Sequence, residues 1–213
     1  MIARNPRLLC SLAALMTLSA LGACATTQQA TSYYTLMPDN AAAAAASDMS
    51  YQIEILPVEI PQQVDVAQMV VRAGNGELVP VETRRWIAPL GSEIRNSLSW
   101  QLTRMLGVRD VAGFSKNGKT PVYRVNLRVQ RFDSAPGSYA RMDALWSIRD
   151  SNGDAPAAVC SSSANITVGS GYGALAQGHQ QAIAQIAGEI AASIRAARAS
   201  SGAPACAMTA VQS

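Results

Sequence analysis

Lysine and histidine are nearly absent from this sequence of 213 residues. Lys116 and Lys119 are its two lysines, and His179 is its single histidine. A dedicated transition-metal site needs several imidazole, thiolate or carboxylate ligands, and no acidic cluster at ligand spacing accompanies this histidine. A nucleic-acid-binding protein needs a basic stripe that contacts phosphates, which a near-neutral chain with two lysines does not provide. We therefore expect no metal, no cofactor and no nucleic-acid partner.

The sequence motifs of catalysis are also missing. No G-x-S-x-G nucleophile motif occurs. Residues 169–174 match the dinucleotide-binding pattern G-x-G-x-x-[GA], but the acidic residue about 20 positions on, Glu189, lies inside a predicted helix and not after a second parallel strand. A glycine-rich turn from strand to helix is the better interpretation. His179 allows two interpretations, a general base or metal ligand, or a histidine on the apolar stripe of a helix that is bonded to a neighbour, and we favour the second. The sequence predicts that the protein is not an enzyme.

The apolar stretch over residues 8–21 is too short and too interrupted to span a hydrocarbon core of ~30 Å. It follows Arg4 and Arg7 and leads into Leu21-Gly22-Ala23-Cys24. A basic start, an apolar stretch and small residues before a cysteine are the parts of a secretory signal with a lipobox. We predict that residues 1–23 are a lipoprotein signal peptide and that Cys24 becomes the acylated N-terminus, carrying chains such as palmitate. A plain secretory signal with a coincidental cysteine is the alternative.

Several acyl chains on one residue anchor a protein stably, because each buried CH₂ contributes ~0.8 kcal/mol. Ala25 follows Cys24, where lipoproteins retained at the inner membrane typically carry an aspartate. We therefore expect the outer membrane of a diderm bacterium, with the protein on its periplasmic face. Removal of Arg4 and Arg7 leaves fifteen basic residues against fourteen acidic ones.

Two cysteines remain in the body of the chain, Cys160 and Cys206. In an oxidising compartment such a pair is most simply a disulfide, and the lack of a C-x-x-C motif disfavours a redox-active pair. The bond would close a loop of 45 residues and contribute ~4 kcal/mol in the chain-entropy model. It would tie the C-terminal tail, residues 200–213, to the folded domain.

The mature chain reads as a lipidated tether and loop over 24–50, followed by one domain over 51–199. Alternating apolar residues predict strands, and helical spacing of apolar residues predicts two amphipathic helices. The expected strands cover 51–58, 68–72, 77–81, 123–131, 140–148 and 156–168, and the expected helices cover 90–106 and 175–194. This order favours an α+β fold with a mostly antiparallel sheet and two amphipathic helices packed on one face.

Two groups of residues are candidates for contact with a partner. Arg124 and Arg128, with Arg141, share the predicted solvent face of the sheet, where they would bind acidic groups or simply be solvated. Trp86 follows Arg84 and Arg85 before a predicted helix, where a large aromatic residue either fills the core or forms the centre of an interface.

Three sequence segments together resemble the PqiC-like ABC-type transport auxiliary lipoproteins. They are Tyr33-Tyr34-Thr35-Leu36 soon after the lipobox, Ile55-Leu56-Pro57-Val58-Glu59-Ile60-Pro61, and Arg85-Trp86-Ile87-Ala88-Pro89-Leu90 at the start of a helix. In this order, with the later strands and the terminal helix, the resemblance covers nearly the whole mature chain. Val66 and Ala67 stand where the family often has a basic residue, and Ala88 stands where an acid is common.

The resemblance implies an outer-membrane lipoprotein that serves as a docking component of an MCE-type lipid transport system and helps to maintain envelope integrity. Its implied partners are an MCE-domain periplasmic protein and the inner-membrane transporter of that protein, and the resemblance also implies a ring of copies. The candidate contacts are Pro57, Pro61, Arg85, Trp86, Arg124 and Arg128. Two other functions stay open: a periplasmic carrier that holds lipid in a cleft between helices and sheet, and a structural lipoprotein of a secretion or cell-wall complex.

Overall fold

The computed structural model describes residues 29–39, 50–115, 118–151, 158–200 and 206. The predicted signal peptide, the predicted acylation site Cys24 and most of the tail lie outside the described residues. From Thr31 on, the described residues belong to one compact unit of two sheets and two long helices. None of the helices in these residues is long and apolar enough to cross a membrane.

The larger sheet has four strands in the order β2-β5-β6-β7. Strands β5 (Val122–Ala135), β6 (Tyr139–Asp150) and β7 (Ala158–Thr167) pair antiparallel, whereas the short β2 (Gln52–Ile55) pairs parallel with β5. Apolar and polar residues alternate along β5 and β6, so one face of the sheet is buried and the other faces water. This alternation confirms the predicted strands.

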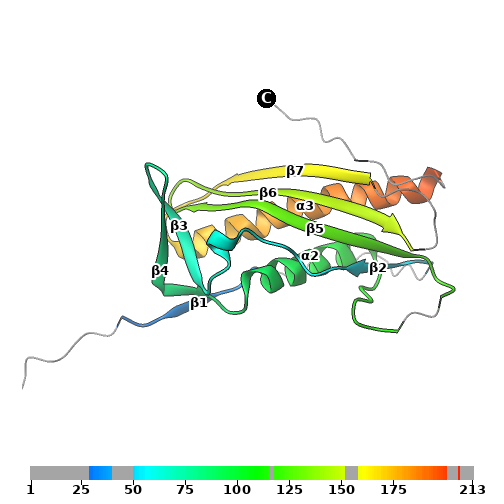
Figure 1. Ribbon diagram of the computed structural model, residues 1–213, viewed down its shortest axis with the longest axis horizontal. Coiled ribbons are helices and arrows are strands. Elements are labelled where there is room, and N and C mark those ends of the chain that lie inside the picture. Colours follow the sequence, from blue (N-terminus) through cyan, green and yellow to red (C-terminus); the bar gives the residue numbers. More distant parts are fainter. Residues whose placement is uncertain (1–28, 40–49, 116–117, 152–157, 201–205, 207–213) are drawn as a thin grey trace, which may run out of the picture. The chain divides into compact units, whose positions relative to one another are not determined.

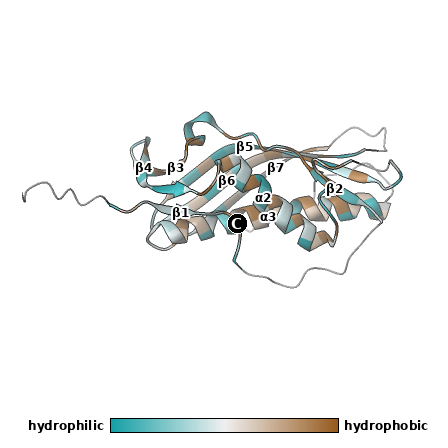
Figure 2. Ribbon diagram, turned by 90° about the horizontal axis from the view of Figure 1, so that it is seen from below, coloured by the Kyte–Doolittle hydropathy of each residue, from teal (hydrophilic) through white to brown (hydrophobic). Residues whose placement is uncertain are grey.

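Helices α2 (Leu90–Leu106) and α3 (Tyr172–Ser200) cover the buried face of the four-stranded sheet (Figures 1 and 2). Pro89 precedes the first helical residue of α2, and Gly107 ends this helix with a left-handed φ of 69°. Both ends agree with the sequence. The predicted helix over 175–194 is confirmed as the central part of α3.

A second sheet, of three strands, was not predicted. Strands β3 (Gln68–Gly74) and β4 (Glu77–Trp86) form the expected hairpin, and β1 (Ser32–Tyr34) pairs parallel with the end of β4. The predicted α+β fold with two helices on one face of a mostly antiparallel sheet is confirmed, but the strands form two mixed sheets and each sheet includes one parallel pair. Residues 32–36 fall within the segment assigned from the sequence to the lipidated tether and loop over 24–50, yet Ser32–Tyr34 form β1 and Leu36 is fully buried in the core.

A disulfide joins Cys160 of β7 to Cys206, with their Cα atoms 5.5 Å apart. The Sγ of Cys206 lies 3.5 Å from the carbonyl oxygen of Val159. The bond holds this point of the C-terminal tail against the edge strand β7, as the sequence predicted.

Gly178 of α3 packs closely against the end of the sheet. A Cβ atom at this position would lie 2.4 Å from Val168 Cγ1 and 2.8 Å from Ala140 Cβ. Both atoms are attached closely to the backbone, so they cannot move aside without shifting a strand end or the helix. A glycine is therefore required here by packing.

We predict that Gly178→Ala lowers the free energy of unfolding by ~1–3 kcal/mol, because overpacking outweighs the better helix propensity of alanine. Gly188→Ala in the same helix is the matched control, since a Cβ there meets no atom within 4 Å. The control should be neutral or more stable by up to ~1 kcal/mol. Urea unfolding monitored by circular dichroism measures both, and equal effects of the two changes would contradict the packing argument.

Candidate partner-binding site

A hollow of about 570 Å³ lies where α2 begins, and we call it the α2 hollow. The chain that leaves β2 continues along β5 as far as Glu59, whose amide donates to Leu127 O at 3.3 Å and whose carbonyl accepts from Val129 N at 2.8 Å. The first turn of α2 passes close to this segment, and a Cβ on Gly91 would lie 3.1 Å from Val58 O. The hollow is lined by Pro57, Val58, Glu59, Ile60, Asp65, Pro89, Gly91, Ser92 and Arg95.

A second hollow, of about 440 Å³, adjoins the first and shares Asp65 and Pro89 with it. We call it the β1 hollow. Its walls meet through backbone hydrogen bonds, since Ile87 N donates to Tyr34 O and Trp86 N donates to Ala67 O, both at 2.9 Å. The hollow is lined by Tyr33, Asp65, Val66, Ala67, Arg85, Trp86, Ile87, Ala88 and Pro89.

The two hollows bring together several of the residues that the sequence suggested. Pro57 lines the α2 hollow, while Arg85 and Trp86 line the β1 hollow. Pro61 lies just before the short 3-10 helix η2 (Gln62–Val64), in the segment between Ile60 and Asp65. The sequence analysis did not name several of the lining residues as candidate contacts, among them Tyr33, Val66, Ile87 and Ser92. Tyr33 and Ile87 fall inside the family-like segments, which was the one sequence signal that pointed to them.

The structure corrects the proposed role of Trp86 as an accessible contact. Its side chain is only 4 % exposed and lies edge-on to Phe132 at a centroid distance of 6.1 Å. Trp86 is the last residue of β4 and points into the core, so it supports the wall of the β1 hollow from behind. Of the two interpretations, the core residue is the one that the geometry supports.

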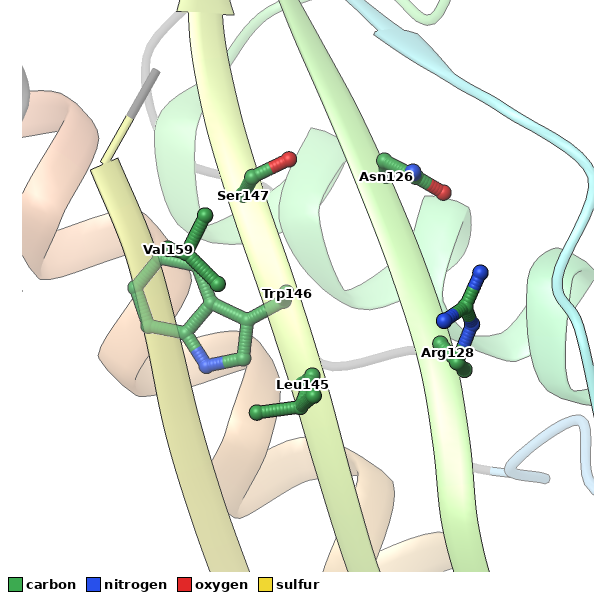
Figure 3. A pocket seen from close by; sticks show the side chains of 6 residues that line it. All are labelled: Asn126, Arg128, Leu145, Trp146, Ser147 and Val159. Atoms are coloured by element: carbon green, nitrogen blue, oxygen red, sulfur yellow. The ribbon is translucent and has the colours of Figure 1, made fainter.

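Arg124 and Arg128 lie on the open face of the four-stranded sheet, apart from α2 and α3. Each already binds a carboxylate, Arg124 to Glu54 at 2.8 Å and Arg128 to Glu59 at 2.6 Å. The hydrogen bond that Arg128 Nε donates to the Glu59 carboxylate raises the pKa of Arg128. A shallow hollow of about 190 Å³ on this face is bordered by Arg128, Leu145 and Val159 (Figure 3). This face carries ion pairs and is not a stripe of unpaired basic groups.

His179 is fully buried between Phe132 and Ser134. Its ring stacks on Phe132 at 3.8 Å, and Nε2 lies 2.8 Å from Ser134 Oγ. Burial lowers the pKa of His179 to about 3, against the opposing effect of the Asp133 charge. The histidine is therefore neutral, as expected for a core residue bonded to a neighbour. The described residues hold no cluster of three or more metal-ligating side chains.

The sequence model of the ABC-type transport auxiliary lipoprotein component matches residues 34–191, from the end of β1 well into α3. The chain belongs to this family. Both hollows are built within the matched residues, apart from Tyr33, which precedes them by one position.

Solved structures share the fold of this transport auxiliary lipoprotein. An uncharacterized protein aligns with a TM-score of 0.62 at 18% identity, over 78% of this chain and 99% of its own. A Xanthomonas campestris protein of the family DUF330 aligns with a TM-score of 0.60 at 18% identity, over 80% of this chain and 98% of its own. The PelC dodecamer of Paraburkholderia phytofirmans has a TM-score of 0.38 at 13% identity, over 68% and 92%, which is too weak to inform the assembly. No curated protein matches the sequence.

We predict that Trp86→Ala in this lipoprotein lowers the free energy of unfolding by ~3–5 kcal/mol, because it empties a large core site. Ile87→Ala is the neighbouring control, since Ile87 is 60 % exposed and should cost far less. Thermal unfolding of the two variants distinguishes the cases, and a fully stable Trp86→Ala protein would contradict the core assignment.

The low pKa of His179 predicts acid sensitivity. The unfolded chain protonates this ring near its ordinary value of 6.5, whereas the folded protein does so only at about 3. Between these values the unfolded state binds more protons, so stability is complete above pH ~6.5 and falls as the pH drops, with a slope approaching ~1.4 kcal/mol per pH unit.

His179→Gln removes the titrating ring and should remove this part of the slope. Urea titrations of both proteins between pH 7 and pH 4 test the assignment. Parallel stability curves for wild type and variant would show that His179 does not carry the effect.

Proposed function

We propose that this protein is the outer-membrane docking component of an MCE-type lipid transport system. Acyl chains on Cys24 hold it on the periplasmic face, and the α2 hollow receives the MCE-domain protein that leads to the inner-membrane transporter. The protein catalyses no reaction in this role. A ring of copies around the tip of the partner would multiply weak single contacts.

The observation that carries the proposal is the α2 hollow itself, which lies beside the β1 hollow and falls within the family match. Its lining combines prolines and aliphatic side chains with Glu59, Asp65 and Arg95. Arg95 is held in place by Asp110 at 2.9 Å, so the lining includes a fixed polar group. Protein interfaces combine apolar contact area with polar groups, which a lining of this mixed composition provides.

Docking is favoured over lipid carriage because the space between the helices and the sheet is filled. Leu127, Ile186 and Ile190 are each at most 1 % exposed there, and Trp146 is 2 % exposed. A lipid placed between these layers would have to displace packed side chains. The α2 hollow and the β1 hollow lie instead at the start of α2 and the end of β4.

A pull-down of the acylated protein from outer-membrane extracts, with bound proteins identified by mass spectrometry, tests the function. Recovery of an MCE-domain protein is the expected result. Recovery of only cell-wall or secretion components would overturn the transport role and leave the family and the fold in place.

We predict that Ser92→Tyr weakens recovery of the MCE-domain protein about tenfold or more, because an interface residue that blocks a pocket costs over ~1.4 kcal/mol. Ser92 is exposed on the first turn of α2 and lines the α2 hollow. Asn96→Tyr is the matched control, since Asn96 is exposed one turn later and does not line the hollow. Equal recovery with both variants would place docking elsewhere on the protein.

We predict that Cys24→Ser abolishes incorporation of labelled palmitate and releases the protein from the membrane fraction, because no thiol remains to be acylated. Cys10→Ser is the control and should incorporate label normally, because Cys10 lies within the signal peptide and lacks small residues before it. Fractionation and mass spectrometry of the N-terminus provide the measurements. A Cys24→Ser protein that stays acylated would contradict the lipobox assignment.

A further inference from the structure

Exposed large apolar side chains gather in the β1 hollow. Among the described residues five such side chains are exposed, and three of them, Tyr33, Val66 and Ile87, line this one hollow. Tyr33 is 59 % exposed and Ile87 is 60 % exposed. We call these three residues the β1 patch. Scattered apolar residues on a surface are ordinary, but a group of them marks an interaction surface.

The backbone holds the β1 patch in a fixed arrangement. Tyr33 is the register partner of Arg85 in the parallel ladder of β1 and β4, and Ile87 N donates to Tyr34 O at 2.9 Å. Side chains alternate along β4 and its continuation, so Trp86 points into the core while Arg85 and Ile87 point outward. Tyr33 thus lies in the edge strand β1 and Ile87 directly follows β4, while Val66 lies in the bend just before β3.

The predicted acylation site indicates which surface contacts the β1 patch. Only nine positions separate the predicted acylated Cys24 from Tyr33. Fully extended, this segment reaches about 30 Å, and as a flexible coil it averages about 16 Å. The patch is therefore kept near the bilayer by its own tether, at a distance comparable to the size of a small domain.

Arg85 is a second feature of the β1 hollow that suits contact with a phospholipid surface. Its side chain is 37 % exposed, and its guanidinium lies 3.6 Å from the exposed carboxylate of Glu82 and donates through Nε to the Glu82 carbonyl at 3.3 Å. A surface pair of this kind is weak, so the guanidinium can turn to a phosphate group at little cost. A tyrosine and two aliphatic side chains beside an arginine have the composition of a membrane-interface contact.

We propose that the β1 patch lies against the phospholipid leaflet that holds the acyl chains of Cys24. Tyr33, Val66 and Ile87 enter the headgroup boundary, and Arg85 binds lipid phosphate. The inference rests on the lipid anchor of the proposed function. It fixes the orientation of the domain, and it places the adjoining α2 hollow next to the membrane surface.

The test uses the full mature, acylated protein in vesicles of phosphatidylethanolamine and phosphatidylglycerol that contain spin-labelled phospholipid. An environment-sensitive fluorophore is attached at Ile87→Cys in one sample and at Phe114→Cys in another. Phe114 is the matched control because it is 74 % exposed and belongs to the loop between α2 and β5, at the end of the domain away from β1 (Figure 1). Cys160 and Cys206 are joined to each other and do not react.

The expected result is that the label at Ile87 loses emission to the spin-labelled lipid, while the label at Phe114 keeps its emission. Adding Tyr33→Ser and Val66→Ser to the Ile87-labelled protein should restore emission toward the control. Equal quenching of the two labels, in a protein that floats with the vesicles, would overturn the membrane contact and leave the lipid anchor standing.

Two other outcomes separate the inference from the proposed function. A mature protein that does not float with vesicles overturns the anchor, and the membrane contact with it. Alternatively, the label at Ile87 is not quenched by the spin-labelled lipid, but its emission shifts when the recovered MCE-domain protein is added. This result assigns the patch to protein docking, which overturns the membrane contact and supports the docking role.

Discussion

The buried carboxylate of Glu93 ties the start of the folded chain to the rest of the structure. Its Oε2 accepts the amide of Leu36 at 2.7 Å and the hydroxyl of Thr35 at 2.8 Å, and the residue is only 4 % exposed. A carboxylate in the first turn of a helix is favoured by the helix dipole, but a buried one without donors would be costly. Glu93 and the segment around Leu36 therefore depend on each other, and the segment must remain docked for α2 to begin where it does.

The docking of the segment around Leu36 positions the walls of both hollows. Gln180 of α3 adds hydrogen bonds to the carbonyls of Thr35 and Met37 at 3.2 and 3.1 Å, so both helices hold the segment from the inside. With the segment fixed, β1 stays in register with β4 and forms a wall of the β1 hollow. The first turn of α2, which carries Glu93, also forms a wall of the α2 hollow. The first described residues of the chain thus lead directly into the two hollows.

Local sequence patterns predicted the long strands and both helices, because alternation and helical spacing extend over many residues there. They did not predict β1, which has three residues and pairs in parallel with a strand about fifty residues later, a contact that no local pattern reports. They also ended the second hairpin strand too early, since Pro80 and the polar run before Trp86 hide its continuation. Part of the site was predicted through family-like segments. The burial of Trp86 and the exposure of Ile87 could not be predicted in this way, because they depend on how β1 and β4 pair, and the family-like segments do not report strand register.

Local sequence patterns also could not show that Arg124 and Arg128 are already paired with carboxylates. Glu54 and Glu59 lie about seventy residues before Arg124 and Arg128, and only the parallel pairing of β2 and its continuation with β5 brings them together. Exchanging such a surface pair for the carboxylate of a partner gains little, because one ion pair replaces another in water. Exposed apolar side chains have no such competitor, and their burial contributes about 25 cal/mol per Å². Burial of exposed apolar side chains therefore favours attachment at the β1 hollow, where three of them lie, over attachment at the paired arginines.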